Sequence, residues 1–180
     1  MKPARDRGPA LQDLDVPIGH ALTDSAADAT ELVVRPVVET DFAAWKPLWD
    51  GYNAFYGRSG PTALPEDVTR VAWSRFIDKA EPVHALIAES AGRLLGFAHF
   101  LYHRSTSQIA LNCYLQDLFT SPDARRTGVG VMLIQAVYAR AREARAGRVY
   151  WHTHHTNATA RRLYDRIADD CGFIVYRKLL

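Results

Sequence analysis

The chain has 180 residues, of which 48% are hydrophobic and 23% are charged, and its formal net charge is +2. The length suits one domain with its own core, the composition excludes low-complexity or fibrous structure, and the small net charge gives no support to nucleic-acid binding. No apolar run is long enough to cross a membrane, and two cysteines, Cys113 and Cys171, do not make a disulfide framework, so we expect a reduced, cytoplasmic protein.

Residues 1–30 are the first region that the sequence sets apart. They are rich in Ala, Asp, Pro and Gly and lack a sustained hydrophobic period, which predicts a disordered or loosely docked arm. Residues 31–180 carry helical and strand-like periods in turn. We expect this second region to form a single domain.

The first part of this domain predicts one strand and two helices. Residues 32–36 form a short apolar run that ends at a proline, which suits a strand. Thr40 is the expected N-cap of a helix that runs to about Phe55. Pro65 and the acidic residues after it suit the first turn of a second helix, which reaches about Ile77.

The middle of the chain changes to a strand period. Residues 83–89 and 94–102 are separated by a turn that contains glycine and therefore predict a hairpin. Residues 112–120 predict a third strand, which a Ser-Pro-Asp sequence ends. This block predicts strands joined by short connections.

The last part of the chain alternates helices and strands. A long amphipathic pattern over residues 131–146 predicts a helix that ends before a glycine. Residues 148–154 predict a strand, residues 157–170 a shorter helix, and residues 173–176 the last strand. This order predicts a mixed sheet with helices on both of its faces.

The segment from residue 125 to residue 130 is the most informative motif. Its sequence, Arg-Arg-Thr-Gly-Val-Gly, follows a predicted strand and opens a predicted helix. The first N–H groups of a helix lack partners within it and carry partial positive charge, so a phosphate can bind there. Gly128 and Gly130 allow the backbone to approach the ligand closely, and the two arginines add cationic donors. The motif also fits a simple connection between a strand and a helix.

A second motif follows in the next predicted helix, where Asn157, Ala160 and Tyr164 have a fixed spacing. With Arg125, Gly128 and Gly130 it makes two ordered motifs in the correct strand and helix context. Over residues 32–180 the chain resembles the GNAT superfamily of acyl-CoA-dependent N-acetyltransferases, and within it the branch of histone and polyamine acetyltransferases. The similarity to that branch rests on residues 115–118, 134–138 and 149–151.

This resemblance implies a fold, a cosubstrate and partners. The implied fold is α/β (α+β), with a mixed, mostly antiparallel sheet of six to seven strands and helices on both faces. The implied cosubstrate is acetyl-CoA, with no metal. The implied partners are a small-molecule amine or a protein lysine as acceptor and a second copy of the chain in a homodimer, without nucleic acid or membrane.

The resemblance also implies which residues bind acetyl-CoA. The backbone at the end of one strand pairs with the pantetheine arm, the N–H groups of the loop hold the pyrophosphate, and an asparagine contacts the pantetheine. In chain order these residues are Leu118, Phe119, Thr120, Arg125, Arg126, Thr127, Gly128, Val129, Gly130, Val131 and Asn157. The asparagine also fits a helix N-cap, and the two roles are compatible.

Two residues are candidates for catalysis. Tyr164 is implied to lie near the thioester sulfur, and a phenol with a pKa of about 10 keeps a proton for the departing thiolate. The acceptor ammonium must lose a proton before it attacks, and Asp117 is the first candidate base, acting directly or through water. In a regular strand Gln116 points to the opposite face. Asp117 also fits a structural carboxylate, and Glu39 is a weaker candidate base.

The acceptor site is less determined by the sequence. Trp45, Trp49, Tyr52 and Tyr56 share one helical stripe, which suits a core. The two tyrosines also suit substrate binding, because their rings can hold a cationic amine. A polyamine, a protein lysine and another small amine stay open as acceptors. A non-catalytic acyl-CoA-binding or regulatory module is the alternative from another class.

Three histidines near the end of a predicted strand raise the question of a metal. His152 and His154 share one strand face, and His155 follows them. No cysteine or carboxylate nearby completes a ligand set, so we expect a polar strand end and no metal site.

Overall fold

A computed structural model describes residues 31–180 of the chain. These residues form a five-stranded sheet with the strand order β1-β2-β3-β4-β5. The predicted arm over residues 1–30 lies outside the described residues. In the part of the chain that the structure describes, no helix combines the length and apolar character needed to span a bilayer.

The sheet is mixed, as the sequence predicts, and mostly antiparallel, as the resemblance implies. Its strands are β1 (Val33–Pro36), β2 (Val83–Ser90), β3 (Arg93–His103), β4 (Asn112–Thr120) and β5 (Arg148–Tyr150). The first four strands pair antiparallel with their neighbours, and β5 runs parallel to β4. The predicted hairpin and third strand are thus confirmed.

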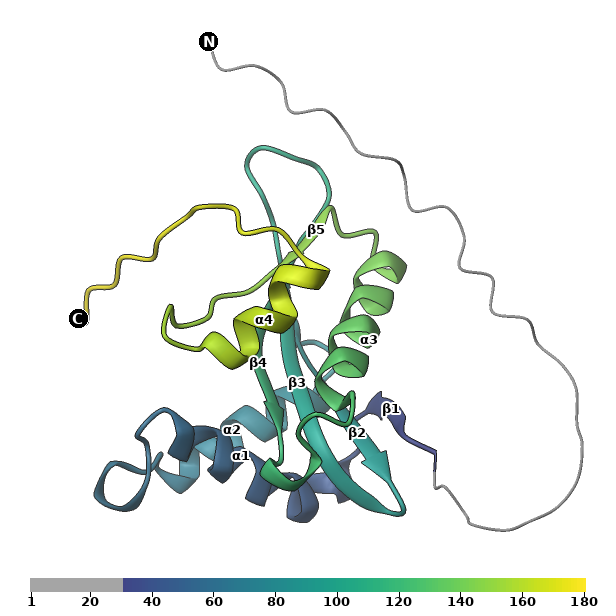
Figure 1. Ribbon diagram of the computed structural model, residues 1–180, viewed down its shortest axis with the longest axis vertical. Helices are drawn as coiled ribbons and strands as arrows, with labels where there is room; N and C mark the ends of the chain where they lie inside the picture. Colours follow the sequence, from purple (N-terminus) through teal and green to yellow (C-terminus); the bar gives the residue numbers. More distant parts are fainter. Residues whose placement is uncertain (1–30) are drawn as a thin grey trace, which may run out of the picture.

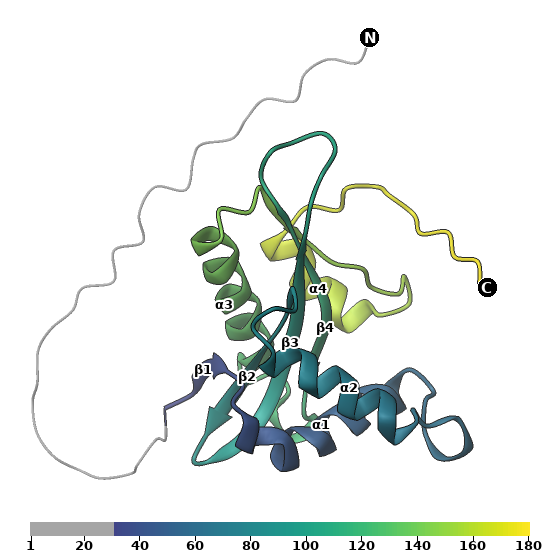
Figure 2. The same ribbon diagram turned by 180° about the vertical axis from the view of Figure 1, so that it is seen from behind.

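Helices cover both faces of the sheet, which is also as predicted. They are α1 (Phe42–Phe55), α2 (Glu66–Ile77), α3 (Val129–Glu143) and α4 (Ala158–Ile167). Three short 3-10 helices are η1 (Glu39–Asp41), η2 (Gly60–Thr62) and η3 (Pro122–Ala124). Figure 1 shows α3 and α4 in front of the sheet, and Figure 2 shows α1 and α2 across the opposite face.

The alternation of side chains along the strands divides the interior into two cores. The aliphatic core lies between the sheet and α3, and its buried members include Leu86, Ala98, Leu115, Leu133, Ile134 and Val137. The aromatic core lies between the sheet and the helices α1 and α2. Its buried members are Trp45, Leu48, Trp49, Tyr52, Trp73, Ile87, Phe97 and Phe119.

The predicted strand over residues 173–176 is wrong. The segment is irregular, and Phe173 and Tyr176 are 87% and 88% exposed. A strand needs a hydrogen-bonded neighbour, and no strand in residues 31–180 pairs with this segment. The described sheet therefore has five strands, where the resemblance implies six to seven.

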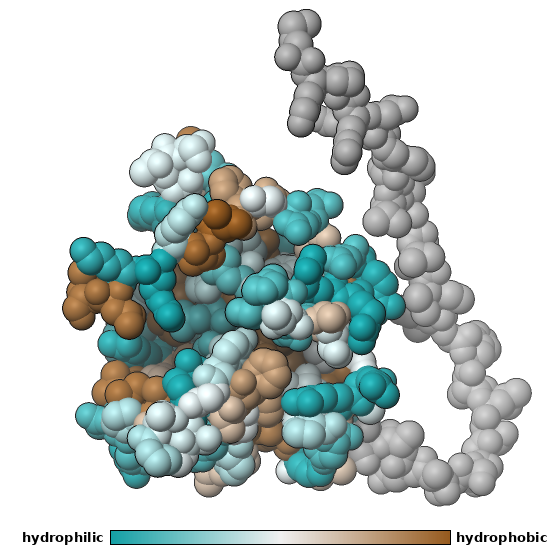
Figure 3. Space-filling view, turned by 60° about the vertical axis from the view of Figure 1, so that its left-hand side comes forward, coloured by the Kyte–Doolittle hydropathy of each residue, from teal (hydrophilic) through white to brown (hydrophobic). Residues whose placement is uncertain are grey.

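On the face drawn in Figure 3, apolar residues form separate patches among hydrophilic ones.

The predicted N-cap at Thr40 is also wrong, because a 3-10 turn precedes the helix. Thr40 lies inside η1, and Asp41 holds the turn in its place. The Asp41 carboxylate accepts hydrogen bonds from Val38 N at 2.8 Å and from Arg35 at 2.7 and 2.9 Å. The Arg35 guanidinium keeps the pKa of Asp41 below its ordinary value. Three hydrogen bonds from Arg35 and Val38 to an ionised side chain fix this turn, so the helix begins after Asp41 and not after Thr40.

Candidate active site

A cavity of about 830 Å³ lies where α1, β4, the start of α3 and α4 meet. It brings together the two motifs that the sequence analysis singled out, since the loop before α3 and Tyr164 both line it. The segments are far apart in sequence, so the fold itself creates this proximity. One open space thus adjoins a strand edge, a helix N-terminus and several tyrosines.

The strand edge becomes free because β4 and β5 separate. Their pairing covers only Asn112–Tyr114 and Arg148–Tyr150, whereas β4 continues to Thr120. Leu118, Phe119 and Thr120 line the cavity beyond that point. An extended ligand can therefore pair with the backbone of β4 as an added strand would.

The loop before α3 places bare N–H groups on the cavity. Gly128 is the N-cap of α3 and has φ +91°, a left-handed conformation that favours glycine. The residues after it, Val129, Gly130 and Val131, begin the helix and line the cavity with Arg125 and Arg126. This gives the helix terminus the geometry of an anion site.

Thr127 is the predicted loop residue that does not line the cavity. Its hydroxyl donates a hydrogen bond to the Ala124 carbonyl at 2.7 Å, so it braces the turn instead. At Gly130 an added Cβ would lie 3.6 Å from Thr120 Oγ1, which is ordinary contact. The glycine needed for backbone conformation is therefore Gly128, while the position of Gly130 has room for a Cβ.

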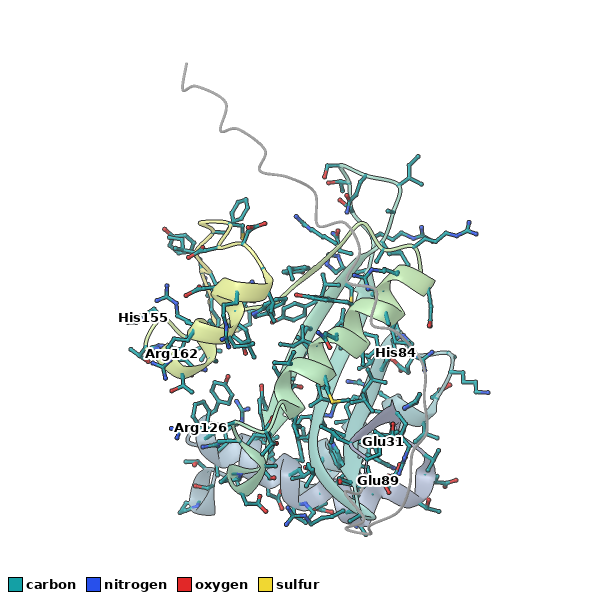
Figure 4. The ribbon with its side chains drawn as sticks, turned by 45° about the vertical axis from the view of Figure 1, so that its right-hand side comes forward. Glu31, His84, Glu89, Arg126, His155 and Arg162 are labelled. Carbon is teal, nitrogen blue, oxygen red and sulfur yellow. The ribbon has the colours of Figure 1, made fainter. Side chains whose placement is uncertain are left out.

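Four arginines surround this side of the cavity. Arg125 and Arg126 belong to the loop, and Arg162 and Arg166 lie one turn apart on α4. Figure 4 shows Arg126 and Arg162 on the same side of the molecule, from these two different elements. The sequence analysis missed the α4 pair. Their i, i+4 spacing after Asn157 was the available signal.

The second motif lies on α4, across the cavity from the loop. Asn157 is the N-cap of the helix, and its Oδ1 accepts a hydrogen bond from Ala160 N at 3.4 Å. Tyr164 packs edge-on against Trp151, with ring centroids 5.2 Å apart. Burial, and to a lesser extent the nearby Tyr56, raises the pKa of Tyr164 to about 12. The phenol thus stays protonated at neutral pH and can donate a hydrogen bond into the cavity.

The position of Asp117 depends on a β-bulge. In the β3–β4 ladder His99 pairs with Asp117 and Phe100 pairs with Leu115, which leaves Gln116 as the extra residue. The sequence analysis treated this strand as regular. In the structure Gln116 is exposed and lines the cavity, whereas Asp117 is 8% exposed and faces the aromatic core. Asp117 itself does not line the cavity.

Asp117 is held by a chain of hydrogen bonds. Its Oδ1 accepts from the Tyr52 hydroxyl at 2.5 Å, and its Oδ2 lies 3.0 Å from His99 Nδ1. The other nitrogen of His99, Nε2, accepts from Trp45 Nε1 at 3.2 Å. Burial lowers the pKa of His99 despite the carboxylate beside it, so the imidazole is neutral. Burial, followed by the charge of Asp117, raises the pKa of Tyr52 far above its ordinary value.

The predicted substrate residues, on α1 and just after its end, lie at this end of the cavity. Tyr52 and Tyr56 both line it, and their rings meet edge-to-face with centroids 5.0 Å apart. The guanidinium of Arg58 lies 5.5 Å from the Tyr56 ring centroid. The weaker base candidate, Glu39, is exposed in η1 and does not line the cavity.

Two of the three histidines after β5 lie within hydrogen-bond distance of a hydroxyl group. His152 lines the cavity, and its Nδ1 lies 3.1 Å from the Tyr114 hydroxyl. His154 Nδ1 lies 2.6 Å from Thr156 Oγ1. Among residues 31–180, no group of three or more potential ligands could hold a metal ion.

Sequence reasoning missed the two residues behind Asp117. Trp45 appeared only as a member of an aromatic stripe, and His99 only as part of a strand. The available signal for His99 was a polar residue on the inward face of an apolar strand. Its partner could not be read from the sequence, because the Trp45–His99 hydrogen bond spans 54 residues.

Comparison with known proteins points to one family for this chain. Residues 45–169 match the family model described as the acetyltransferase (GNAT) family. A relative from Saccharomyces cerevisiae, D-amino-acid N-acetyltransferase HPA3, is 34% identical over 149 residues, which cover 82% of this chain and 90% of the relative. A relative from Bacillus subtilis, the uncharacterized N-acetyltransferase YhfO, is 32% identical and covers 79% of this chain and 94% of its own.

Solved structures agree with the fold. The structure of the aminoglycoside N-acetyltransferase AAC(6')-Iy in complex with CoA superposes with a TM-score of 0.72, at 16% identity, over 84% of this chain and 96% of that one. At this identity the likeness concerns the fold alone.

Proposed function

The chain belongs to the GNAT family of acetyltransferases, and on that premise we propose that it acetylates the primary amine of a small molecule by direct attack on acetyl-CoA. It is an acetyl-CoA-dependent N-acetyltransferase. The observation that supports the proposal is a single cavity that adjoins the free edge of β4, the N-terminus of α3 and the tyrosines of α1 and α4. The acceptor and the residue roles below are our proposals.

The donor occupies the α3 side of this cavity. The N–H groups that follow Gly128 bind the pyrophosphate, because they lack helical partners and line the cavity together with the arginines of the loop. Arg162 and Arg166 add positive charge from α4. The pantetheine arm pairs with the backbone of Leu118, Phe119 and Thr120, with Asn157 as a further contact.

The acceptor occupies the α1 side, where Tyr52 and Tyr56 offer ring faces to a cationic amine. The 34% identical yeast relative is named for D-amino acids, so we propose amino acids, and D-amino acids first, among the small amines. Polyamines and a protein lysine are the alternatives from the sequence. A homodimer and a cytoplasmic location stay predictions.

Two ionisable groups divide the proton chemistry. Asp117 takes a proton from the acceptor ammonium, which frees the lone pair that attacks the thioester carbonyl. Tyr164 keeps its proton at neutral pH and donates a hydrogen bond to the sulfur as the carbon–sulfur bond breaks. The products are the acetylated amine and free CoA.

A thiol-release assay with acetyl-CoA and a panel of amines tests the function. The panel contains D-amino acids, their L-enantiomers, a polyamine, an aminoglycoside and a lysine peptide. We expect turnover with a small amine, and stoichiometric acetylation of that amine by mass spectrometry. Binding of acetyl-CoA without turnover of any amine would instead indicate the non-catalytic module.

The donor site has a matched pair of variants. Gly128→Val should raise the KM for acetyl-CoA about tenfold, a loss of about 1.4 kcal/mol in binding. Gly92→Val is the control, because Gly92 also has positive φ and open space around it but lies in the β2–β3 turn, away from the cavity. Equal KM values in the two variants would contradict the pyrophosphate site.

A further inference from the structure

We propose that Tyr52 carries the proton of the acceptor amine to Asp117. In this route the Tyr52 hydroxyl meets the ammonium in the cavity, and the buried carboxylate behind it receives the charge. The inference rests on the proposed function and names the path by which the amine becomes a nucleophile.

The first observation is which of the two residues reaches the cavity. Both residues are buried, each 8% exposed, but Tyr52 lines the cavity and Asp117 does not. The Tyr52 hydroxyl lies 2.5 Å from Asp117 Oδ1, so the phenol stands between the carboxylate and the open space. An ammonium in the cavity therefore meets Tyr52 before it meets Asp117.

The second observation is the direction of each hydrogen bond. An indole nitrogen only donates, so His99 Nε2 accepts from Trp45 and the proton of the neutral imidazole sits on Nδ1. That Nδ1–H donates to Asp117 Oδ2. An ionised carboxylate only accepts, so the Tyr52 hydroxyl donates to Oδ1. The Tyr52 oxygen then has a lone pair left for a donor in the cavity.

The transfer balances in protons and charge. One N–H bond of the ammonium breaks as an O–H bond forms at Tyr52, and the original Tyr52 O–H bond breaks as one forms at Asp117 Oδ1. The amine gains a lone pair, Asp117 becomes neutral, and Tyr52 is a phenol before and after the step. After the product leaves, the reverse transfer returns the proton to solvent.

The burial of Tyr52 favours a relay over a phenolate base. Burial and the adjacent carboxylate raise its pKa well above the ordinary value, so a free phenolate does not form near neutral pH. A concerted transfer avoids that charge, because Asp117 accepts one proton while the amine supplies another. His99 and Trp45 are positioning residues in this scheme, since their hydrogen bonds fix the orientation of the carboxylate.

The other ionisable groups around Tyr52 and Asp117 do not replace Asp117 as the proton acceptor. Tyr56 and Arg58 on or after α1 interact electrostatically with Tyr52, and Tyr114 on β4 interacts with Asp117. Burial raises the pKa of Tyr114, and an arginine stays charged throughout. Asp117 is thus the one carboxylate in this group, and it is the group that the Tyr52 hydroxyl contacts.

Tyr52→Phe tests the proposal, because it removes the hydroxyl and keeps the ring that packs in the aromatic core. Rates with the best amine of the panel are measured at saturating substrates and at pH 7 and pH 10. At pH 7 most of a primary amine is protonated, and we expect kcat to fall about 100-fold. At pH 10 much of the amine is already neutral, so the loss should shrink below about tenfold. The KM for acetyl-CoA should not change.

Asp117→Asn should give the same pattern, because an amide cannot take the proton. Tyr102→Phe is the matched control, since it removes a phenol hydroxyl from a half-buried tyrosine of β3 that does not line the cavity. It should keep wild-type kcat at both pH values. Melting curves followed by circular dichroism check that each variant folds. If Asp117→Asn does not fold, the Tyr52→Phe variant alone tests the relay.

Each other outcome has a distinct meaning. A wild-type protein that turns over no amine overturns the proposed function, and the relay with it. An active wild type with an equally active Tyr52→Phe variant overturns the relay alone. A loss that is equal at pH 7 and pH 10 also overturns it, because Tyr52 would then serve only to position the amine.

Discussion

The two faces of the central sheet bury different kinds of residue for different purposes. In the aliphatic core, Leu133, Ile134 and Val137 are fully buried by apolar neighbours. The aromatic core also encloses His99 and Asp117, whose polar atoms are paired with Trp45 and Tyr52. A purely apolar core needs only volume to be filled, whereas a buried polar group needs a partner for each of its atoms.

The distribution of buried polar residues follows this division. Of the six that residues 31–180 contain, five lie in η1, α1, α2 or on the strand face that α1 covers, namely Asp41, Asn53, Thr69, His99 and Asp117. The sixth, Asn112, opens β4. The aliphatic side is therefore the scaffold, and the aromatic side carries the charge that the proposed reaction uses.

The largest effect should come from a cavity in the scaffold. Leu133→Ala removes a side chain that is 0% exposed and should lower the free energy of unfolding by about 2–5 kcal/mol. Because the polar network lies on the other face, kcat and KM of the folded variant should stay near wild type. Denaturant melts and assays well below the melting temperature measure both. A large loss of kcat in fully folded protein would show that the two faces are not independent.

The next effect concerns Tyr164, the one reactive candidate that packs against the aliphatic core. Tyr164→Phe should lower kcat about 10- to 100-fold, since it removes the donor to the departing sulfur. In the wild type the phenol pKa of about 12 should keep this donor active at pH 10, where an ordinary tyrosine is half ionised. A tyrosine-dependent fall in kcat centred on pH 10 would contradict the raised value.

A smaller effect should appear on acidification, and it belongs to the aromatic face. The unfolded chain binds a proton on His99 below pH about 6.5, whereas burial lowers the pKa in the folded protein. The contribution of neutral His99 to the free energy of unfolding is thus present above pH 6.5 and is lost as the pH falls. The free energy of unfolding should decrease by about 1 kcal/mol between pH 7 and 5.5. His99→Gln should remove this pH dependence in urea melts. Burial also lowers the pKa of His84, which is only half-buried against Phe100, so His84→Asn should remove a smaller part of the pH dependence and retain most of it.

The smallest effect is expected at the edge of the aromatic core. The pKa of Asp41 is lowered by its hydrogen bond to Arg35, so this carboxylate stabilises the fold above its unfolded pKa of about 3.9. Asp41→Asn should cost about 0.5–1 kcal/mol at pH 7, at the low end because Arg35 is 34% exposed. The difference from wild type should vanish as the pH falls through the folded pKa of Asp41. A cost that is independent of pH would assign the effect to packing.

The sequence was sufficient where local pattern decides structure. The hairpin and the strand at residues 112–120 follow from alternation and turn residues, and the structure has them where they were expected. It failed at residues 173–176, where an apolar run has no strand beside it. The propensity of a residue for a strand reflects how well its side chain packs against a neighbouring strand. The apolar sequence of residues 173–176 does not show whether such a strand is present.

The same distinction explains what was missed at the site. Asp117 and Tyr52 were both candidates, but their contact joins residues 65 apart and depends on how α1 packs over the sheet. The local sequence Leu115-Gln116-Asp117 does not predict a bulge. The alternation of a regular strand would put Leu115 and Asp117 on one face, whereas in the structure they face different cores.

The bulge has a consequence for changes in chain length. Residues 113 and 115 face the aliphatic core, while residues 117 and 119 face the aromatic one. If Gln116 were removed, the strand would alternate regularly, and all the remaining side chains would keep their present faces. Deletion of this one codon should therefore leave both cores filled. It would instead straighten β4, because a bulge bends the strand that carries it. The packing of the fold does not need this inserted residue. Its gain or loss during evolution would therefore change the shape of the cavity in a single genetic step and leave both cores intact.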